Sequence, residues 1–164
     1  MSLIDSYNVG AEVIGVQGTS SLSIAQTSAS AATTQDGLTI DRTGLPRRFY
    51  SAKAVAAFGY LAASTQTVAT LSLNFQHSSD GSSWDNYSTA TVPTAATFGT
   101  SAAGGGTTYY GVVSQSVNLN GARRYVRVQV PAPTYANCSS GQGVFSGGVT
   151  VIFGGPDTYP ASTS

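Results

Sequence analysis

Charged residues are scarce in this sequence of 164 residues. They make up 9 % of the chain, with seven Lys and Arg against seven Asp and Glu, whereas about a quarter of a soluble domain is charged. The even balance leaves no net field to attract nucleic acid or an anionic membrane, so we expect neither as a partner. A surface with little charge also offers little repulsion between copies, which favours a protein that works in an assembly.

Cysteine is limited to one residue, and basic leader residues and long apolar runs are missing. The single Cys138 has no second cysteine with which to form a disulfide within the chain. Residues 1–10 have neither the basic residues nor the apolar run of a secretory signal. No stretch approaches the roughly eighteen apolar residues of a membrane-spanning helix. We therefore expect a protein that folds in a reducing cytosol without disulfides.

Small residues fill the place of the missing charge, and apolar residues alternate with polar ones. The chain has 19 Gly, and helical spacing is scarce. The clearest alternations are LSLNFQ (71–76), YVRVQV (125–130) and VTVIF (149–153), each typical of a strand. Further strands are expected at 12–16, 38–40, 51–61 and 112–119, although the alanines of 51–61 would also allow a helix. Many short strands predict an all-β fold, an antiparallel β-sandwich or jelly roll.

One domain accounts for the chain, because no repeat or linker divides it. Two long Ala/Ser/Gly-rich loops, residues 27–37 and 93–108, interrupt the strands, and loops longer than about twelve residues are usually functional or mobile. Residues 156–164 contain two prolines and no apolar pattern. We predict a single β-sandwich domain over residues 1–155 and an extended C-terminal arm over 156–164 that a neighbouring subunit holds in place.

The sequence offers few residues for catalysis or metal binding. His77, the only histidine, would need a nucleophile and an orienting acid beside it to act in a triad, and its place at a strand end favours a partly buried hairpin residue. Asp36 and Asp41 could offer oxygens to Ca²⁺, but that ion takes six to eight ligands. Residues 104–106, three glycines, lack the lysine and helix of a phosphate loop. We expect no enzymatic activity, no cofactor and no metal.

Six of the seven basic residues are arginine, and most of them fall into two groups. Arg47 and Arg48 form one group, and Arg123, Arg124 and Arg127 form the other. The planar guanidinium binds carboxylates bidentately and stays charged, which suits interface ion pairs. The groups predict docking to an acidic patch on a partner or a second subunit. The alternative is a pair of solvated strand ends.

Two stretches of the chain together resemble known families. SSDGSSWDNY (78–87) directly follows an alternating run, and GARRYVRVQVP occupies residues 121–131. The pair resembles signatures of discoidin-type (F5/8 C) β-sandwiches and of small β-sandwich virion proteins of tailed bacteriophages. In both families the motif is structural. The resemblance implies that Asp80 and Gly81 close a hairpin turn and that Trp84 packs over it. We expect Trp84 to lie in the core rather than on a sugar-binding surface.

Departures from the discoidin pattern favour the second family. Discoidin domains are typically exported and often carry a disulfide, whereas this sequence shows no export signal and a single cysteine. The resemblance then implies a virion protein assembled in the host cytoplasm, namely a capsid decoration (cement) protein that stabilises the phage head shell. Its partners would be the major capsid protein and copies of itself, as a homo-oligomer such as a trimer. A tail or head–tail connector component and a carbohydrate-binding module are the alternatives.

The predicted contact residues of such a decoration protein lie in the arginine groups, the N-terminal segment and the C-terminal arm. The individual residues are Arg47, Arg48, Arg123, Arg124, Pro156, Tyr159 and Pro160. In a carbohydrate-binding module, aromatic rings would instead stack on sugar rings. The candidates for that role are Trp84, Tyr109, Tyr110 and Tyr135.

Overall fold

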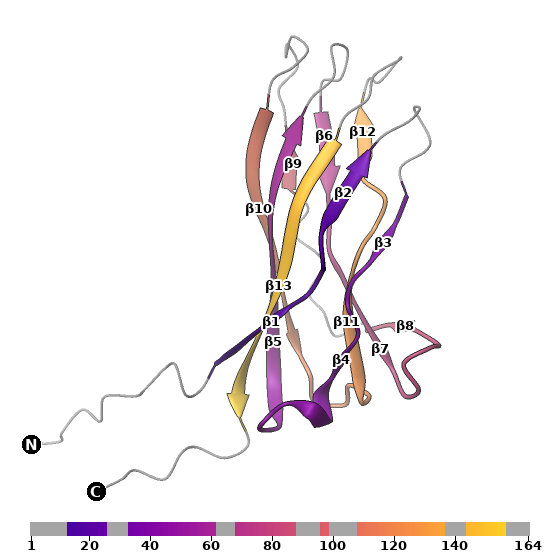
Figure 1. Ribbon diagram of the computed structural model, residues 1–164, viewed down its shortest axis with the longest axis vertical. Coiled ribbons are helices and arrows are strands. Elements are labelled where there is room, and N and C mark those ends of the chain that lie inside the picture. Colours follow the sequence, from indigo (N-terminus) through magenta and orange to yellow (C-terminus); the bar gives the residue numbers. More distant parts are fainter. Residues whose placement is uncertain are drawn as a thin grey trace, which may run out of the picture.

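A computed structural model describes the strands and most of their connections. It covers residues 13–25, 33–61, 68–87, 96–98, 108–136 and 144–156. Within these ranges every regular element is a β-strand except one turn of 3-10 helix, η1 (Arg42–Gly44). The strand pairings are antiparallel, and the strands form two layers (Figure 1). The predicted antiparallel all-β sandwich is confirmed. The described residues contain no helix that could traverse a membrane.

The first layer is one large sheet. Its strands follow the order β1–β13–β5–β10, and β2 also pairs with β13. β5 (Phe49–Leu61) and β13 (Val144–Pro156) have thirteen residues each, and β10 (Thr108–Asn118) has eleven. These three strands therefore run along most of the long axis (Figure 1). β1 (Ile14–Gln17) and β2 (Leu22–Ala25) pair with successive parts of the same edge of β13.

The second layer consists of two smaller sheets that follow one another along the long axis. One has the order β3–β11–β7–β8, with β4 also paired to β11, and the other has the order β12–β6–β9. Residues 72–73 separate β6 from β7, and residues 131–133 separate β11 from β12, so both strand pairs continue from one sheet to the next. The bounds are β3 (Gln35–Asp36), β4 (Ile40–Asp41), β6 (Val68–Leu71), β7 (Asn74–Ser78), β8 (Asp85–Asn86), β9 (Ala96–Phe98), β11 (Tyr125–Val130) and β12 (Thr134–Ala136).

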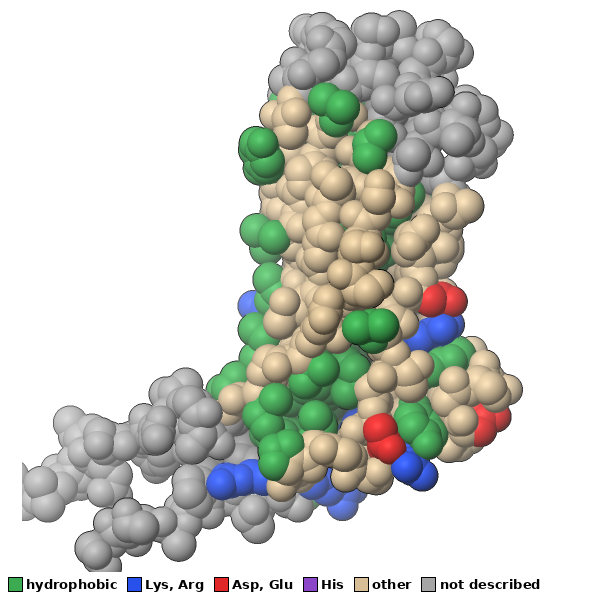
Figure 2. All heavy atoms as spheres, viewed as in Figure 1, with side chains coloured by type: hydrophobic (Ala, Val, Ile, Leu, Met, Phe, Trp, Pro, Cys, Tyr) green, Lys and Arg blue, Asp and Glu red, His purple; other side chains and the backbone are tan. Residues whose placement is uncertain are grey.

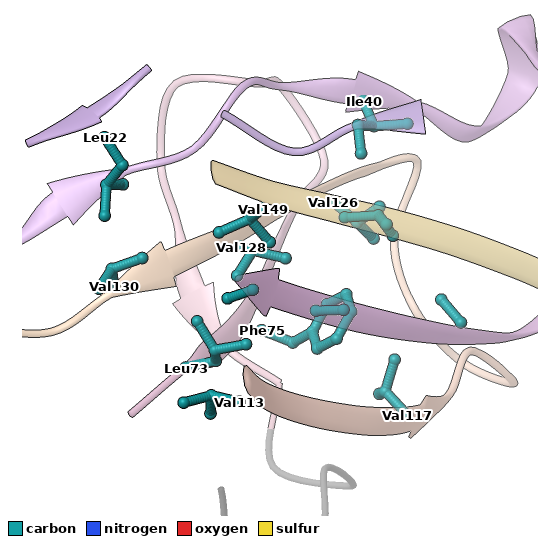
Figure 3. Close-up of a cluster of buried hydrophobic side chains, with 14 of the residues drawn as sticks. Leu22, Ile40, Leu73, Phe75, Val113, Val117, Val126, Val128, Val130 and Val149 are labelled. Carbon is teal, nitrogen blue, oxygen red and sulfur yellow. The ribbon is translucent and has the colours of Figure 1, made fainter. Parts of the chain in front are cut away.

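Alternation places apolar side chains between the layers. In β11, Val126, Val128 and Val130 are buried while the residues between them are half-buried. These side chains lie beside Phe75 of β7 and Val149 of β13 in the core (Figure 3). The core is therefore built from alternate positions of strands in both layers, as the pattern of residues 125–130 and 149–153 predicts.

One predicted strand changed in detail, and another, over residues 51–61, is confirmed. The strand expected over residues 71–76 is interrupted at 72–73, where the chain passes from β6 to β7. The stretch 51–61, where the alanines left a helix open, is part of strand β5. Every second side chain from Ala52 to Tyr60 is buried. This period of two suits a strand that covers a core on one face, and an α-helix has no such period.

The two layers are joined along one side by backbone hydrogen bonds. The Gly18 N–H donates to the Val149 carbonyl, and the Gly18 carbonyl accepts from the Leu38 N–H, both at 2.8 Å. The Gly37 N–H donates to the Val128 carbonyl, also at 2.8 Å. A Cβ atom on Gly37 would lie 2.3 Å from the Val128 carbonyl oxygen and 2.5 Å from that of Gly18. Glycine at this position therefore allows the two layers to approach.

The last described strand reaches one residue into the predicted arm. Pro156 belongs to β13 and is paired with Phe49 of β5. Tyr159 and Pro160 lie outside the described residues, so the arm and its contacts stay predictions.

Candidate interaction surfaces

The Asp-Gly motif forms the hairpin between β7 and β8. The Asp80 carboxylate accepts hydrogen bonds from the backbone N–H groups of Ser83 and Ser82, at 2.9 and 2.8 Å, and from the Ser78 hydroxyl at 2.8 Å. These bonds, those of Ser83 first, hold the pKa of Asp80 well below its ordinary value. Gly81 has a φ of 78°, which favours glycine. The motif is thus explained by the turn that it closes.

Trp84 does not belong to the hydrophobic core, which corrects that expectation. Its ring is half-buried, and the Arg127 guanidinium carbon lies 4.3 Å from the ring centroid. Arg127 also pairs with Asp36 at 3.1 Å. Arg127 alternates with the buried valines of β11, so the stack lies on the outside of the second layer. The buried aromatic residue of this hairpin is Tyr87, whose hydroxyl donates to the Asn120 carbonyl at 2.8 Å.

His77 is a partly buried hairpin residue. Its ring centroid lies 4.8 Å from that of Tyr87, and its Nδ1 accepts from the Arg123 N–H at 3.4 Å. Burial, with a smaller contribution from the Arg123 charge, lowers the pKa of His77. Cys138 lies outside the described residues. Within the described ranges, no group of three or more His, Cys, Asp or Glu side chains is placed to hold a metal ion.

Three of the four arginines predicted as contacts line one hollow at the base of the sandwich, the end where η1 lies. The hollow has a volume of about 550 Å³, and Arg47, Arg48 and Arg124 contribute to its wall. Arg42, which the sequence analysis did not single out, also lines it. We call this site the arginine hollow. Figure 2 shows Lys and Arg side chains gathered at this end of the molecule.

The arginine hollow is held together by contacts within the chain. Arg42 donates to the backbone carbonyls of Ala122, Arg123 and Phe49, the latter two at 3.2 and 3.3 Å. Burial, followed by the nearby charge of Arg48, lowers the pKa of Arg42. The Arg48 guanidinium carbon lies 5.5 Å from the centroid of the Tyr50 ring. Arg42 therefore ties η1 and the start of β5 to the connection between β10 and β11.

Arg124 and Arg123 are each placed by an ion pair. Arg124 binds Asp41 with one contact of 2.7 Å and two of 3.2 Å. The hydrogen bonds from Arg124, followed by that from the Thr43 hydroxyl, hold the pKa of Asp41 well below its ordinary value. Arg123 is not among the residues that line the hollow, and it pairs with Asp85. The structure thus brings Arg124 to the Arg47–Arg48 group and separates Arg123 from it.

The outward-facing side of β5, β10 and β13 forms a second surface, which we call the neutral face. Lys53 is the only charged residue in these three strands. Tyr110 is 84 % exposed and Val112 is 64 % exposed. The Tyr110 ring lies over Gly59, where an added Cβ would be 3.5 Å from the ring. The face therefore exposes apolar groups with little charge around them.

The neutral face ends at β10, an edge strand. β10 is the last strand in its sheet and, among the described strands, pairs only with β5. Its eleven residues include no charge and no proline. Long, uncharged edges offer unpaired backbone donors and acceptors to another chain. The part of this edge that β9 does not approach is therefore suited to pairing with a second strand.

Acidification should destabilise the protein through Asp41 and Asp80. Both pKa values lie below the ordinary value of about 3.9, so the stability that these carboxylates contribute is complete above that pH and is lost as the pH falls further. We expect urea unfolding between pH 5 and about pH 2 to show this loss. The variant Asp41→Asn with Asp80→Asn should remove most of the acid sensitivity. Arg124→Gln, which removes the cause at Asp41 but keeps the carboxylate, should reduce it in part. Unchanged pH slopes in both variants would contradict this assignment.

Comparison with known proteins finds structures with a similar fold but does not assign the chain to a family. No protein-family model matches the chain, and no curated protein matches it. A chain in the structure of the Gt strain of infectious bursal disease virus is similar over 90 % of this chain and 34 % of its own length, with 10 % identity and a TM-score of 0.51. A chain of the Gx strain covers 90 % and 33 %, with 9 % identity and a TM-score of 0.48.

A third similar structure comes from a different class of protein. It is the CBM22-1–GH10 module pair of Clostridium thermocellum xylanase 10B, with 9 % identity, a TM-score of 0.35, and coverage of 93 % of this chain and 28 % of that one. This chain therefore spans about a third of the length of the chains that it matches. The likeness to the Gt strain chain shows a shared fold, and the two with TM-scores below 0.5 add nothing to it. The chain is thus an antiparallel β-sandwich, and its function has to be inferred from its surfaces.

Proposed function

We propose that this protein is a non-enzymatic structural component of a virion. More specifically, we propose that it is a capsid decoration (cement) protein of a tailed bacteriophage. It binds the major capsid protein and stabilises the head shell as a homo-oligomer, such as a trimer. The observation that carries this proposal is the neutral face, which is long, nearly uncharged, and bordered by the edge strand β10. Tyr110 and Val112 are exposed on it.

The chemistry of this face suits assembly. Few charges have to leave water when such a surface is covered, so its burial carries little desolvation penalty. An exposed strand edge adds backbone hydrogen bonds to a partner strand. On a symmetric shell, many weak contacts of this kind add up through multivalency.

Two further observations support a structural role over a catalytic one. The described carboxylates are engaged in the fold: Asp36, Asp41 and Asp85 pair with arginines, and Asp80 closes a turn. The Gt strain chain, which matches with a TM-score of 0.51, is part of the structure of infectious bursal disease virus. Since one fold serves many functions, this likeness is supporting evidence only. The main evidence for the proposal is the neutral face.

The copy number of the protein in purified virus particles tests the proposal. Quantitative mass spectrometry should find copies in the hundreds relative to the main shell protein, as a decoration protein requires. A handful of copies would instead make it a tail or head–tail connector component. Complete absence from the particles would contradict the virion role.

Charge placed on the neutral face should weaken binding to the shell. For Tyr110→Lys with Val112→Lys, we expect the affinity for shells that lack the protein to fall about tenfold or more, because two ammonium groups would have to be desolvated. Both residues are exposed, so the variant should fold. Ser82→Lys with Ser83→Lys, on the exposed β7–β8 turn, is the matched control and should bind normally. Equal occupancy for all three proteins would contradict a role of this face.

A carbohydrate-binding module is a second candidate, favoured by one observation. The exposed Tyr110 ring lies next to Gly59 on an almost uncharged surface. Exposed aromatic rings can stack on the apolar faces of sugar rings. Specific retention on a glycan array that is lost in Tyr110→Ala would support this function. Absence of retention on the array would remove it.

A further inference from the structure

The arginine hollow combines guanidinium groups with an apolar wall. Besides its arginines, the wall contains Leu45, Pro46, Phe49 and Ala122. Its volume of about 550 Å³ lies within the range of ligand pockets, roughly 300–1,000 Å³. The hollow can therefore take a charged side chain together with an apolar neighbour.

Two arginines of this wall have only neutral partners among the described residues. Arg42 donates to three backbone carbonyl groups, and the Arg48 guanidinium carbon lies 5.5 Å from the centroid of the Tyr50 ring. No described carboxylate pairs with either arginine. Burial, followed by the charge of Arg48, lowers the pKa of Arg42, so the two cations repel each other. A carboxylate that entered the hollow would relieve this repulsion and could bind a guanidinium bidentately.

The described part of a second copy has no free carboxylate to supply. Three of its carboxylates pair with arginines, and the fourth accepts the hydrogen bonds that close the β7–β8 turn. Each would have to give up these contacts to enter the hollow of another copy. The four residues are Asp36, Asp41, Asp85 and Asp80. The acidic group is therefore expected from a different protein.

A phosphate backbone fits the hollow less well than a protein side chain does. Nucleic acids bind to rows of cations that follow the strand, whereas the cations here line one concave site. One of them, Arg124, is already paired with Asp41. The apolar wall would also lie against charged phosphates instead of an apolar side chain. The hollow therefore favours an acidic protein segment.

The hollow adjoins the neutral face through consecutive residues of β5. Phe49 lines the hollow, and Tyr50 lines a groove of about 680 Å³ at the base end of the face. The groove is also lined by Lys53, Ser116 and Ile152, which alternate with buried residues and so face outward. No described carboxylate pairs with Lys53. A partner that covers the neutral face can therefore reach the hollow along a continuous surface.

We propose that the arginine hollow binds an acidic segment of the major capsid protein, in which an Asp or Glu side chain stands next to an apolar residue. The carboxylate binds the exposed guanidinium of Arg48. Arg42, which the carbonyl groups hold in place, adds its charge nearby. The apolar neighbour packs against Leu45 and Phe49 in the wall. The inference rests on the proposed function, because it names what the shell partner places in this site.

Removal of one charge at two matched positions tests the site. We expect Arg48→Gln to lower the affinity for shells that lack the protein about tenfold at low salt, because the partner's carboxylate then lacks its guanidinium. Arg123→Gln removes the same charge, but Arg123 does not line the hollow, so this variant should bind like the wild type. Both arginines are exposed, so both variants should fold, which thermal unfolding checks.

Cross-linking identifies the group that enters the hollow. A carbodiimide joins an amine to a carboxylate in direct contact as an amide, with the loss of water. In Arg48→Lys bound to shells, mass spectrometry should find the introduced amine joined to an Asp or Glu of the major capsid protein. Arg123→Lys is the matched control and should form no link to that protein from position 123.

The outcomes separate this inference from the function on which it rests. Normal shell binding by Arg48→Gln would overturn the role of the hollow and leave the proposed function intact. A link from position 48 to a second copy of this chain would overturn the shell segment as the occupant. Binding of single-stranded DNA that Arg48→Gln loses would assign the hollow to a phosphate backbone and overturn a protein occupant. A wild type that does not bind shells would contradict the proposed function itself.

Discussion

Replacement of Gly147 by alanine is expected to lower the free energy of unfolding by about 3 kcal/mol. A Cβ atom at this position would lie 2.1 Å from the carbonyl oxygen of Ala57, and 2.9 and 3.0 Å from the Cδ1 and Cα atoms of Phe58. Two of these atoms belong to the backbone of β5. They can move aside only if the register between β13 and β5, in which Gly147 faces Phe58, is distorted.

Gly148 provides the matched control within the same strand. The closest atom to an added Cβ there is the Thr19 hydroxyl oxygen, at 4.0 Å. Gly148→Ala should therefore be neutral or raise stability by up to about 1 kcal/mol, because alanine loses less conformational entropy on folding. Urea unfolding of both variants measures the contrast. Equal losses in the two would contradict the close approach at Gly147.

Phe145→Ala should cost about 4 kcal/mol of stability, the middle of the range for removal of a buried phenylalanine. The ring is fully buried. Its centroid lies 4.6 Å from that of Tyr60 in a stacked arrangement and 6.3 Å from that of Phe58 in an edge-to-face arrangement. The variant loses both aromatic contacts and leaves a cavity between the layers.

Tyr110→Ala is the control for this core variant. Tyr110 is an aromatic residue in the same sheet but 84 % exposed, so its removal should change stability by less than about 0.5 kcal/mol. Phe145→Leu, which keeps part of the apolar volume, should fall between the two. Thermal and urea unfolding give the comparison. A small loss for Phe145→Ala would show that the aromatic stack does not support the core.

The two faces of the first layer therefore have separable effects. The variant at Phe145 acts on the inner side, and the variant at Gly147, an exposed residue beside Tyr110 and Val112, acts on the backbone of β5; both should lower stability. Variants at Tyr110 and Val112 act on the neutral face and should lower assembly while the fold remains stable. This separation allows the proposed virion role to be tested with folded proteins.

Local patterns predicted those parts of the fold that depend on neighbouring residues. Residues 125–130 form the predicted strand, because every second side chain is apolar and one face of the layer is buried. Asp80 and Gly81 close a hairpin, because the carboxylate bonds to the N–H groups that follow it and glycine accepts a positive φ. Each of these features needs only a few consecutive residues.

Local patterns could not predict which aromatic residues are buried and which are exposed. Trp84 was expected near the core, yet it stacks against Arg127 on the outer side of the second layer. Tyr109 packs against the core while its neighbour Tyr110 is exposed. Consecutive residues of a strand point to opposite faces. Which face is buried depends on where the other layer lies, and no local pattern records that for a strand with apolar residues on both sides.

The sequence by itself determined the all-β class, the hairpin turn and the low charge. The tertiary structure alone decided which charges meet. Arg124 joins Arg47 and Arg48 because β4 pairs with β11, which places Asp41 opposite Tyr125. Arg42 completes the arginine hollow through carbonyl groups about eighty residues away in the chain. Contacts over such separations depend on strand pairing and on the packing of two layers, and neither is written in any short stretch of the chain.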